Sequence, residues 1–285
     1  MNWLRIFQTK ADVKSFLIRS ASDLYGFDYQ SLRPNLSEIR NIISLAFYVR
    51  RQSKKYTAVG SGYRGMKFNT SLGNRSFVDV APRGDEAPTP AYQVLYDARL
   101  LSGHDSRRFE DMITGVRAGA KFSIVEAKLV STLERGSPLA FQGLLFHIKF
   151  PGHFSGRTIV ARSGWYKQGE QKEGLSKVGL VSTELERAFS VYSTDQVEAR
   201  TILSPDRLER LVALERHFAG QGLRGIIEGG QMMIALEATN QFEGGGVWPP
   251  LVDKTRFAST LHELGLVCDV IDGLMTHDWQ NQPQR

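Results

Sequence analysis

Four successive segments with a period of two, separated by short turns, constrain the fold of this chain most strongly. They run over residues 112–116, 121–132, 139–150 and 157–162. In the third segment Leu144, Phe146 and Ile148 occupy every second position, which is the spacing of side chains on one face of a strand. The turns between the segments are too short for a crossover helix, so the pattern predicts an antiparallel meander.

Residues 189–238 predict a strand–helix–strand–strand unit whose helix packs on the sheet. Residues 189–192 and 199–203 are expected to be extended. Ser204 is a good N-cap and Pro205 suits the first helical position, so a helix is predicted from there to Gly220. Residues 223–228 and 231–238 then read as a hairpin around Gly229 and Gly230, a pair suited to positive φ.

Helices are predicted at both ends of the chain. Residues 1–25 form a loose amphipathic pattern, and a second helix is expected to begin at Asn35, with Glu38 in the capping position. A final helix is predicted after Asp253, with an apolar stripe at helical spacing. The predicted class is therefore α+β, with a mainly antiparallel β core and packed helices.

These elements suggest four parts. We expect an amino-terminal helical segment at 1–59, a linker-like loop region at 60–90 and an α+β core domain at 91–250. A carboxy-terminal helix and tail follow at 251–285. The boundary near 90 rests on the turn-forming composition of residues 83–90.

Charge is distributed unevenly along the sequence. The net charge is +6, and residues 1–55 hold ten Lys/Arg against four Asp/Glu, whereas residues 201–285 carry a net negative charge. This asymmetry suggests an acidic partner for residues 1–55, which could be an anionic membrane surface, a nucleic acid or an acidic protein. The alternative is a solvated surface that needs no partner.

The sequence indicates a cytoplasmic protein, with a peripheral contact at the inner membrane face as one option. The best apolar run, residues 42–49, is far shorter than the ~20 residues that span a bilayer. The first residues lack the apolar region of a signal peptide. A single cysteine, Cys268, excludes a disulfide framework.

The densest polar cluster, residues 193–200, supplies the only candidate catalytic residues. Asp195, Glu198 and Arg200 could converge, and carboxylates beside an arginine can perform acid–base chemistry. The structural alternative is that Asp195 binds backbone donors in a turn while Glu198 and Arg200 form ion pairs across strands.

Other motifs point to no cofactor and no metal. Residues 60–65 match G-x-G-x-x-G, but no helix is expected after them, as nucleotide binding would require. No pair of histidines has zinc-ligand spacing, and His147 and His153 lack a carboxylate partner. Cys268 falls within a helix stripe and is expected to be a buried, inert thiol. Nucleic-acid binding is not expected, because no recognition motif is visible.

Two segments carry a resemblance to a known family. The first runs from Phe109 through Phe122 and Glu126 to Phe146, and the second is residues 189–200 followed by Leu203-Ser204-Pro205. Together they resemble the bacterial domain-of-unknown-function family 3137 over roughly residues 90–245. The resemblance implies no established activity. It also implies hydrophobic membrane segments before the domain, which residues 42–49 are too short to provide.

Three functional hypotheses follow. The first is a non-enzymatic bacterial binding or scaffold module, peripheral to the inner membrane in one version. The second is an uncharacterised enzyme with its site at Asp195, Glu198 and Arg200. The third is a homo-oligomer assembled through the last helix.

Overall fold

A single antiparallel sheet of nine strands organises the described part of the chain. The computed structural model describes residues 2–32, 87–131, 139–151, 154–163, 174–218, 221–238 and 254–276, with the side chains of residues 2–11, 221 and 256 left aside. The sheet order is β1-β2-β3-β4-β9-β8-β5-β7-β6. The strands are β1 (Asp28–Ser31), β2 (Ser106–Arg117), β3 (Ala120–Val130), β4 (Leu139–Lys149), β5 (Thr158–Arg162), β6 (Ser176–Val178), β7 (Phe189–Ser193), β8 (Gln221–Glu228) and β9 (Gln231–Glu237).

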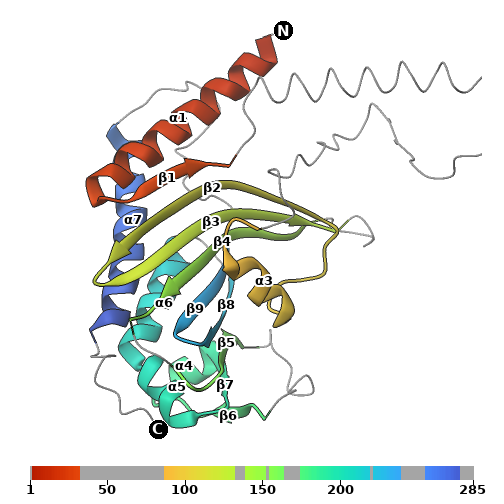
Figure 1. The fold of residues 1–285 in the computed structure, drawn as a ribbon, viewed down its shortest axis with the longest axis vertical. Helices are drawn as coiled ribbons and strands as arrows, with labels where there is room; N and C mark the ends of the chain where they lie inside the picture. The colour runs from red at the N-terminus through yellow and green to blue at the C-terminus, as the bar shows by residue number, and fades with distance from the viewer. Residues whose placement is uncertain are drawn as a thin grey trace, which may run out of the picture. The chain divides into compact units, whose positions relative to one another are not determined.

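Helices cover both faces of this sheet (Figure 1). On one face lie α1 (Asn2–Tyr25), α4 (Thr183–Ala188), α5 (Gln196–Ile202), α6 (Pro205–His217) and α7 (Lys254–Met275). The other face packs against α3 (Pro90–Asp97). Strand β3 shows why two cores form: Phe122 and Ile124 face α1 and α7, whereas Val125 and Leu129 face α3. Alternation along each strand thus supplies both faces.

The predicted class and most predicted elements are confirmed. Strands β2, β3 and β4 form consecutive antiparallel pairs. The β8–β9 hairpin turns at Gly229 and Gly230, which have φ of 57° and 73°, as a two-residue turn of this hand requires. Helix α6 begins after Ser204 with Pro205 at its first position, and it ends at His217, before the predicted Gly220.

The prediction of one continuing meander is wrong beyond β4. The neighbour of β4 is β9, and β5 pairs with β7 and β8. Strand β9 has five consecutive buried residues, Met232 to Leu236, so it belongs in the centre of a sheet that is covered on both faces. Local turn signals did not reveal this insertion.

The prediction that residues 199–203 are extended is also wrong. They belong largely to α5, whose N-cap Asp195 accepts hydrogen bonds from the backbone N–H groups of Val197 and Glu198, both at 2.9 Å. An aspartate three residues before a glutamate is a capping-box pattern. The polar cluster therefore starts a helix.

Four further elements, α3, α4, β1 and β6, were not predicted. The residues before 90 read as linker, but Thr89 caps α3 and Pro90 opens it, the same pair of signals as at Ser204 and Pro205. Strand β1 and strand β6 are only four and three residues long, too short for a period of two to be recognised.

Several predictions fall outside the described residues. These are the helix from Asn35, the G-x-G-x-x-G run at 60–65, the cap at Asp253 and His153. The four-part domain division stays a prediction, although α1 and α7 lie in one compact unit with the strands. Among the described helices, none has the length and apolar character needed to cross a bilayer.

Candidate functional site

The predicted catalytic cluster sits where β7 meets α5. Ser193 Oγ lies 2.8 Å from Thr158 Oγ1 of the neighbouring strand and accepts from the backbone N–H of Asp195 at 3.0 Å. Thr194 Oγ1 accepts from the N–H of Arg157 at 2.9 Å. The hydroxyls of Ser193 and Thr194 therefore connect the end of β7 to the start of β5, independently of the two carboxylates.

Glu198 closes the same corner onto the chain that leads into β5. Its two carboxylate oxygens accept from the backbone N–H groups of Ser155 at 2.9 Å and Gly156 at 2.7 Å. A Cβ on residue 156 would lie 2.6 Å from Glu198 Oε2, so a side chain there would displace the carboxylate. The carboxylate thus accepts from two backbone N–H groups that have no partner in the β ladder.

Arg200 takes no part in this arrangement. It donates to the carbonyl of Gly179 at 3.2 Å and to Gln196 Oε1 at 3.4 Å. Residues 198 and 200 are two apart on a helix, so their side chains do not face each other. The structure joins Asp195 and Glu198 in one backbone-binding corner and leaves Arg200 on a different set of contacts.

A buried ionic cluster lies beneath α1, and a β-bulge creates it. Phe109 pairs with Ala127 and Met112 with Val125, so Glu110 and Asp111 together oppose the single residue Glu126. An extra residue reverses the facing of the strand: Phe109 lies in the core on the α3 side, whereas Ile113 lies in the opposite core. Asp111 and Glu126 consequently point to the same helix.

Lys14 of α1 forms ion pairs with both carboxylates. Its Nζ lies 3.0 Å from Asp111 Oδ2 and 2.5 Å from Glu126 Oε2, and its side chain is only 8% exposed. Tyr29 of β1 donates to Asp111 Oδ1 at 2.7 Å. We call Lys14, Tyr29, Asp111 and Glu126 the ionic latch. It connects α1 and β1 to the neighbouring strands β2 and β3.

The latch holds two carboxylates for one ammonium. Burial raises the pKa of Glu126 to about 7, against the lowering effect of Lys14. Burial and the nearby Asp111 raise the pKa of Tyr29, which keeps its hydroxyl protonated as a donor. Carboxylate oxygens of Glu110, Asp111 and Glu126 lie within 4.8 Å of one another, but Lys14 already supplies the cation between two of them. The latch is therefore a structural ion cluster.

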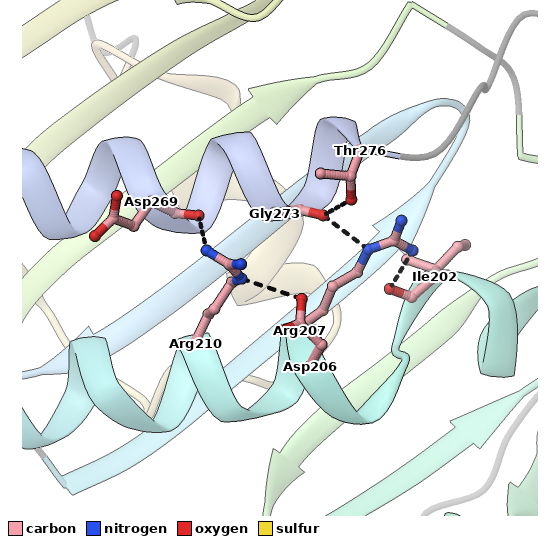
Figure 2. Close-up of polar contacts among 7 residues, drawn as sticks. All are labelled: Ile202, Asp206, Arg207, Arg210, Asp269, Gly273 and Thr276. Carbon is pink, nitrogen blue, oxygen red and sulfur yellow. Dashed lines mark hydrogen bonds and ion pairs between the residues drawn. The ribbon is translucent and has the colours of Figure 1, made fainter.

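A second polar network fixes α7 to α5 and α6 (Figure 2). Arg207 Nε donates to the carbonyl of Gly273 at 3.0 Å, and its Nη1 donates to the carbonyls of Thr201 and Ile202. These carbonyls end α5 and lie in the last turn of α7, where cations are favourable. Desolvation lowers the pKa of this arginine. One guanidinium thus satisfies two helix ends.

The α3 face carries an open cleft of about 410 Å³. Tyr92 and Tyr96 stack one helical turn apart, and His104 meets both rings edge-on. Tyr92 Oη lies 2.7 Å from His104 Nε2, while Ser102 O lies 2.8 Å from Nδ1. Arg107 lies over the Tyr92 ring at 5.0 Å. These contacts fix the side chains relative to one another. No residue spacing in the sequence indicated the cleft.

Three histidines and Cys268 outside these clusters have defined neighbours in the structure. His147 lies 2.7 Å from Gln231 Oε1 on the neighbouring strand. Cys268 is buried, as predicted, and burial raises the pKa of its thiol. His217 of α6 and His262 of α7 face each other, and partial burial together with His262 lowers the pKa of His217.

Comparisons with known proteins support the family resemblance over part of the chain. Residues 139–275 match the family model described as "Protein of unknown function (DUF3137)". The match contains the second motif and Phe141 to Phe146, whereas residues 109–126 precede it. No curated protein matches the sequence significantly.

One solved structure is similar to this chain. It is the crystal structure of the mycobacterial trehalose monomycolate transport factor A, TtfA, at 10% identity and a TM-score of 0.39. The similarity covers 90% of this chain and 94% of that one. A likeness at this score supports no statement about function.

Proposed function

We propose that this chain is a non-enzymatic binding module that docks on an anionic membrane surface through its basic residues 1–55. The observation that carries the proposal is the ionic latch. It anchors α1 and β1 to β2 and β3, and the chain that continues from Leu32 is the most basic part of the sequence.

The charge supports this assignment. Residues 33–55 contain six Lys/Arg and one Asp/Glu, whereas residues 1–32 contain four and three. Each base near an anionic bilayer contributes roughly 1 kcal/mol to binding. Trp3, Ile6 and Phe7, with Arg5, add large apolar residues beside a base at the start of α1, a combination typical of interfacial segments.

The corner at Asp195 and Glu198 supports a role without catalysis. Both carboxylates are occupied by backbone N–H groups of their own chain. A general acid or base needs an oxygen that can reach a substrate proton. No contact in the described residues favours the alternative enzyme function.

Co-sedimentation with lipid vesicles tests the proposal. We expect the chain to bind vesicles that contain phosphatidylglycerol and not to bind vesicles of pure phosphatidylcholine. Binding should weaken as the salt concentration rises. Replacing Arg50, Arg51, Lys54 and Lys55 with Ala should weaken partitioning by up to about a thousandfold. The matched control replaces four exposed lysines of the sheet: Lys121, Lys128, Lys149 and Lys177.

The control separates the effect of where the charges lie from the effect of net charge, because both variants lose four positive charges. Equal losses in the two variants would contradict the assignment to the amino-terminal segment. Absence of binding to the anionic vesicles at low salt would contradict the membrane partner and favour an acidic protein instead. Homo-oligomer formation through α7 stays a separate prediction, checked by light scattering of the chain truncated after Pro250.

A further inference from the structure

Two histidines that lie far apart in the sequence meet at the surface between α6 and α7. His217 is in the last turn of α6, and His262 is in the first half of α7. Their ring centroids are 4.8 Å apart and their planes are inclined by 81°. Both side chains are exposed, so the pair is accessible from solvent.

The separation of the rings agrees with a shared metal ion. Imidazole nitrogens bind zinc at about 2.0–2.1 Å, which places the centroids of two rings on one ion roughly 5 Å apart at a near-tetrahedral angle. The His χ2 torsion is broad. Exposed rings can therefore turn their nitrogens toward one ion while the helices stay in place.

The surroundings hold the two backbones at this distance. Arg210 of α6 donates to Asp206 Oδ2 at 3.1 Å and to the carbonyl of Asp269 in α7 at 3.2 Å (Figure 2). Arg207 adds its bond to Gly273. Among the described residues, neither imidazole has a hydrogen-bond partner that would compete with a metal.

We infer that His217 and His262 form a two-histidine site for a late first-row divalent transition metal that clamps α6 to α7. Imidazole suits zinc, nickel and copper, whereas magnesium prefers oxygen. Water completes the coordination at the exposed position. The inference is independent of the proposed membrane function, because the site involves no residue of the amino-terminal segment.

Titration calorimetry of the tag-free chain with Zn²⁺ and Ni²⁺ tests this site, with Mg²⁺ as the negative control. We expect one high-affinity equivalent and a higher thermal midpoint when the metal is bound. His217→Ala and His262→Ala should each weaken binding by roughly tenfold or more, since the second ligand acts at high effective concentration. His147→Gln is the matched control and should keep the affinity.

The thermal midpoint without metal verifies that the variants fold, and it should change little because both rings are exposed. The site is overturned if either single variant retains its affinity within a few-fold, or if His147→Gln reduces it equally. It is also overturned if metal binds without raising the thermal midpoint, because the metal would then bind the unfolded chain equally well, in which the two helices do not bring His217 and His262 together.

Discussion

Lys14 Nζ lies 2.5 Å from Glu126 Oε2, a buried ion pair between residues 112 positions apart in the sequence. The pair joins α1 to β3. Its second carboxylate, Asp111, reaches Lys14 only because a bulge turns it to the same face. The attachment of α1 thus depends on an irregularity in β2.

Removing the ammonium should destabilise the chain strongly. Lys14→Met leaves Asp111 and Glu126 buried without their counter-ion, and breaking a buried pair in this way costs about 3–5 kcal/mol. Urea denaturation measures the effect. Lys128→Met at an exposed position of β3 is the control and should stay within about 0.5 kcal/mol of the original chain. A similar small loss in Lys14→Met would show that the latch contributes nothing to stability.

Glu126 should make stability depend on pH. Its pKa is raised to about 7 in the folded chain from the usual 4.5, so the folded state binds the extra proton between those values. The free energy of unfolding therefore falls as pH rises from about 4.5 to 7. Denaturation of the original chain and Glu126→Gln across this range should show a shallower fall in the variant. Parallel curves would place the titrating group elsewhere.

The corner at α5 should respond to substitution as a structural unit. Glu198→Ala leaves the backbone N–H groups of Ser155 and Gly156 without their acceptor, and we expect a loss of roughly 2–3 kcal/mol. Asp195→Ala removes an N-cap and should lose about 1 kcal/mol. Arg200→Ala should change the free energy of unfolding by less than about 0.5 kcal/mol. Urea denaturation ranks the three variants, and an equal loss in Arg200→Ala would contradict the separation of this arginine from the corner.

The side chain of Arg210 should make a larger residue at position 273 unfavourable. A Cβ at position 273 would lie 2.6 Å from Arg210 Nε, so we expect Gly273→Ala to destabilise the chain by about 1 kcal/mol. In the Arg210→Ala background the same change should stabilise it by up to about 1 kcal/mol, because alanine is the better helix former. Thermal denaturation of the four chains gives the coupling, and additive effects would exclude the steric explanation.

The sequence by itself determined the local elements. Period-two alternation located β2 to β5, a serine followed by proline located α6, and two consecutive glycines located the β8–β9 hairpin. Each signal acts over a few residues, through side-chain facing, capping or allowed φ. The capping pattern at Asp195 and Glu198 was present too, and the extended interpretation of residues 199–203 overlooked it.

Only the tertiary structure decided which elements are neighbours. Strand β9 enters between β4 and β5, Lys14 meets Glu126, and His217 meets His262, although no spacing in the sequence relates the members of these pairs. Their proximity follows from burying apolar faces on both sides of one sheet, and that requirement acts over the whole chain. Sequence reasoning found the polar residues of the corner, but it could not tell which backbone groups those carboxylates would meet.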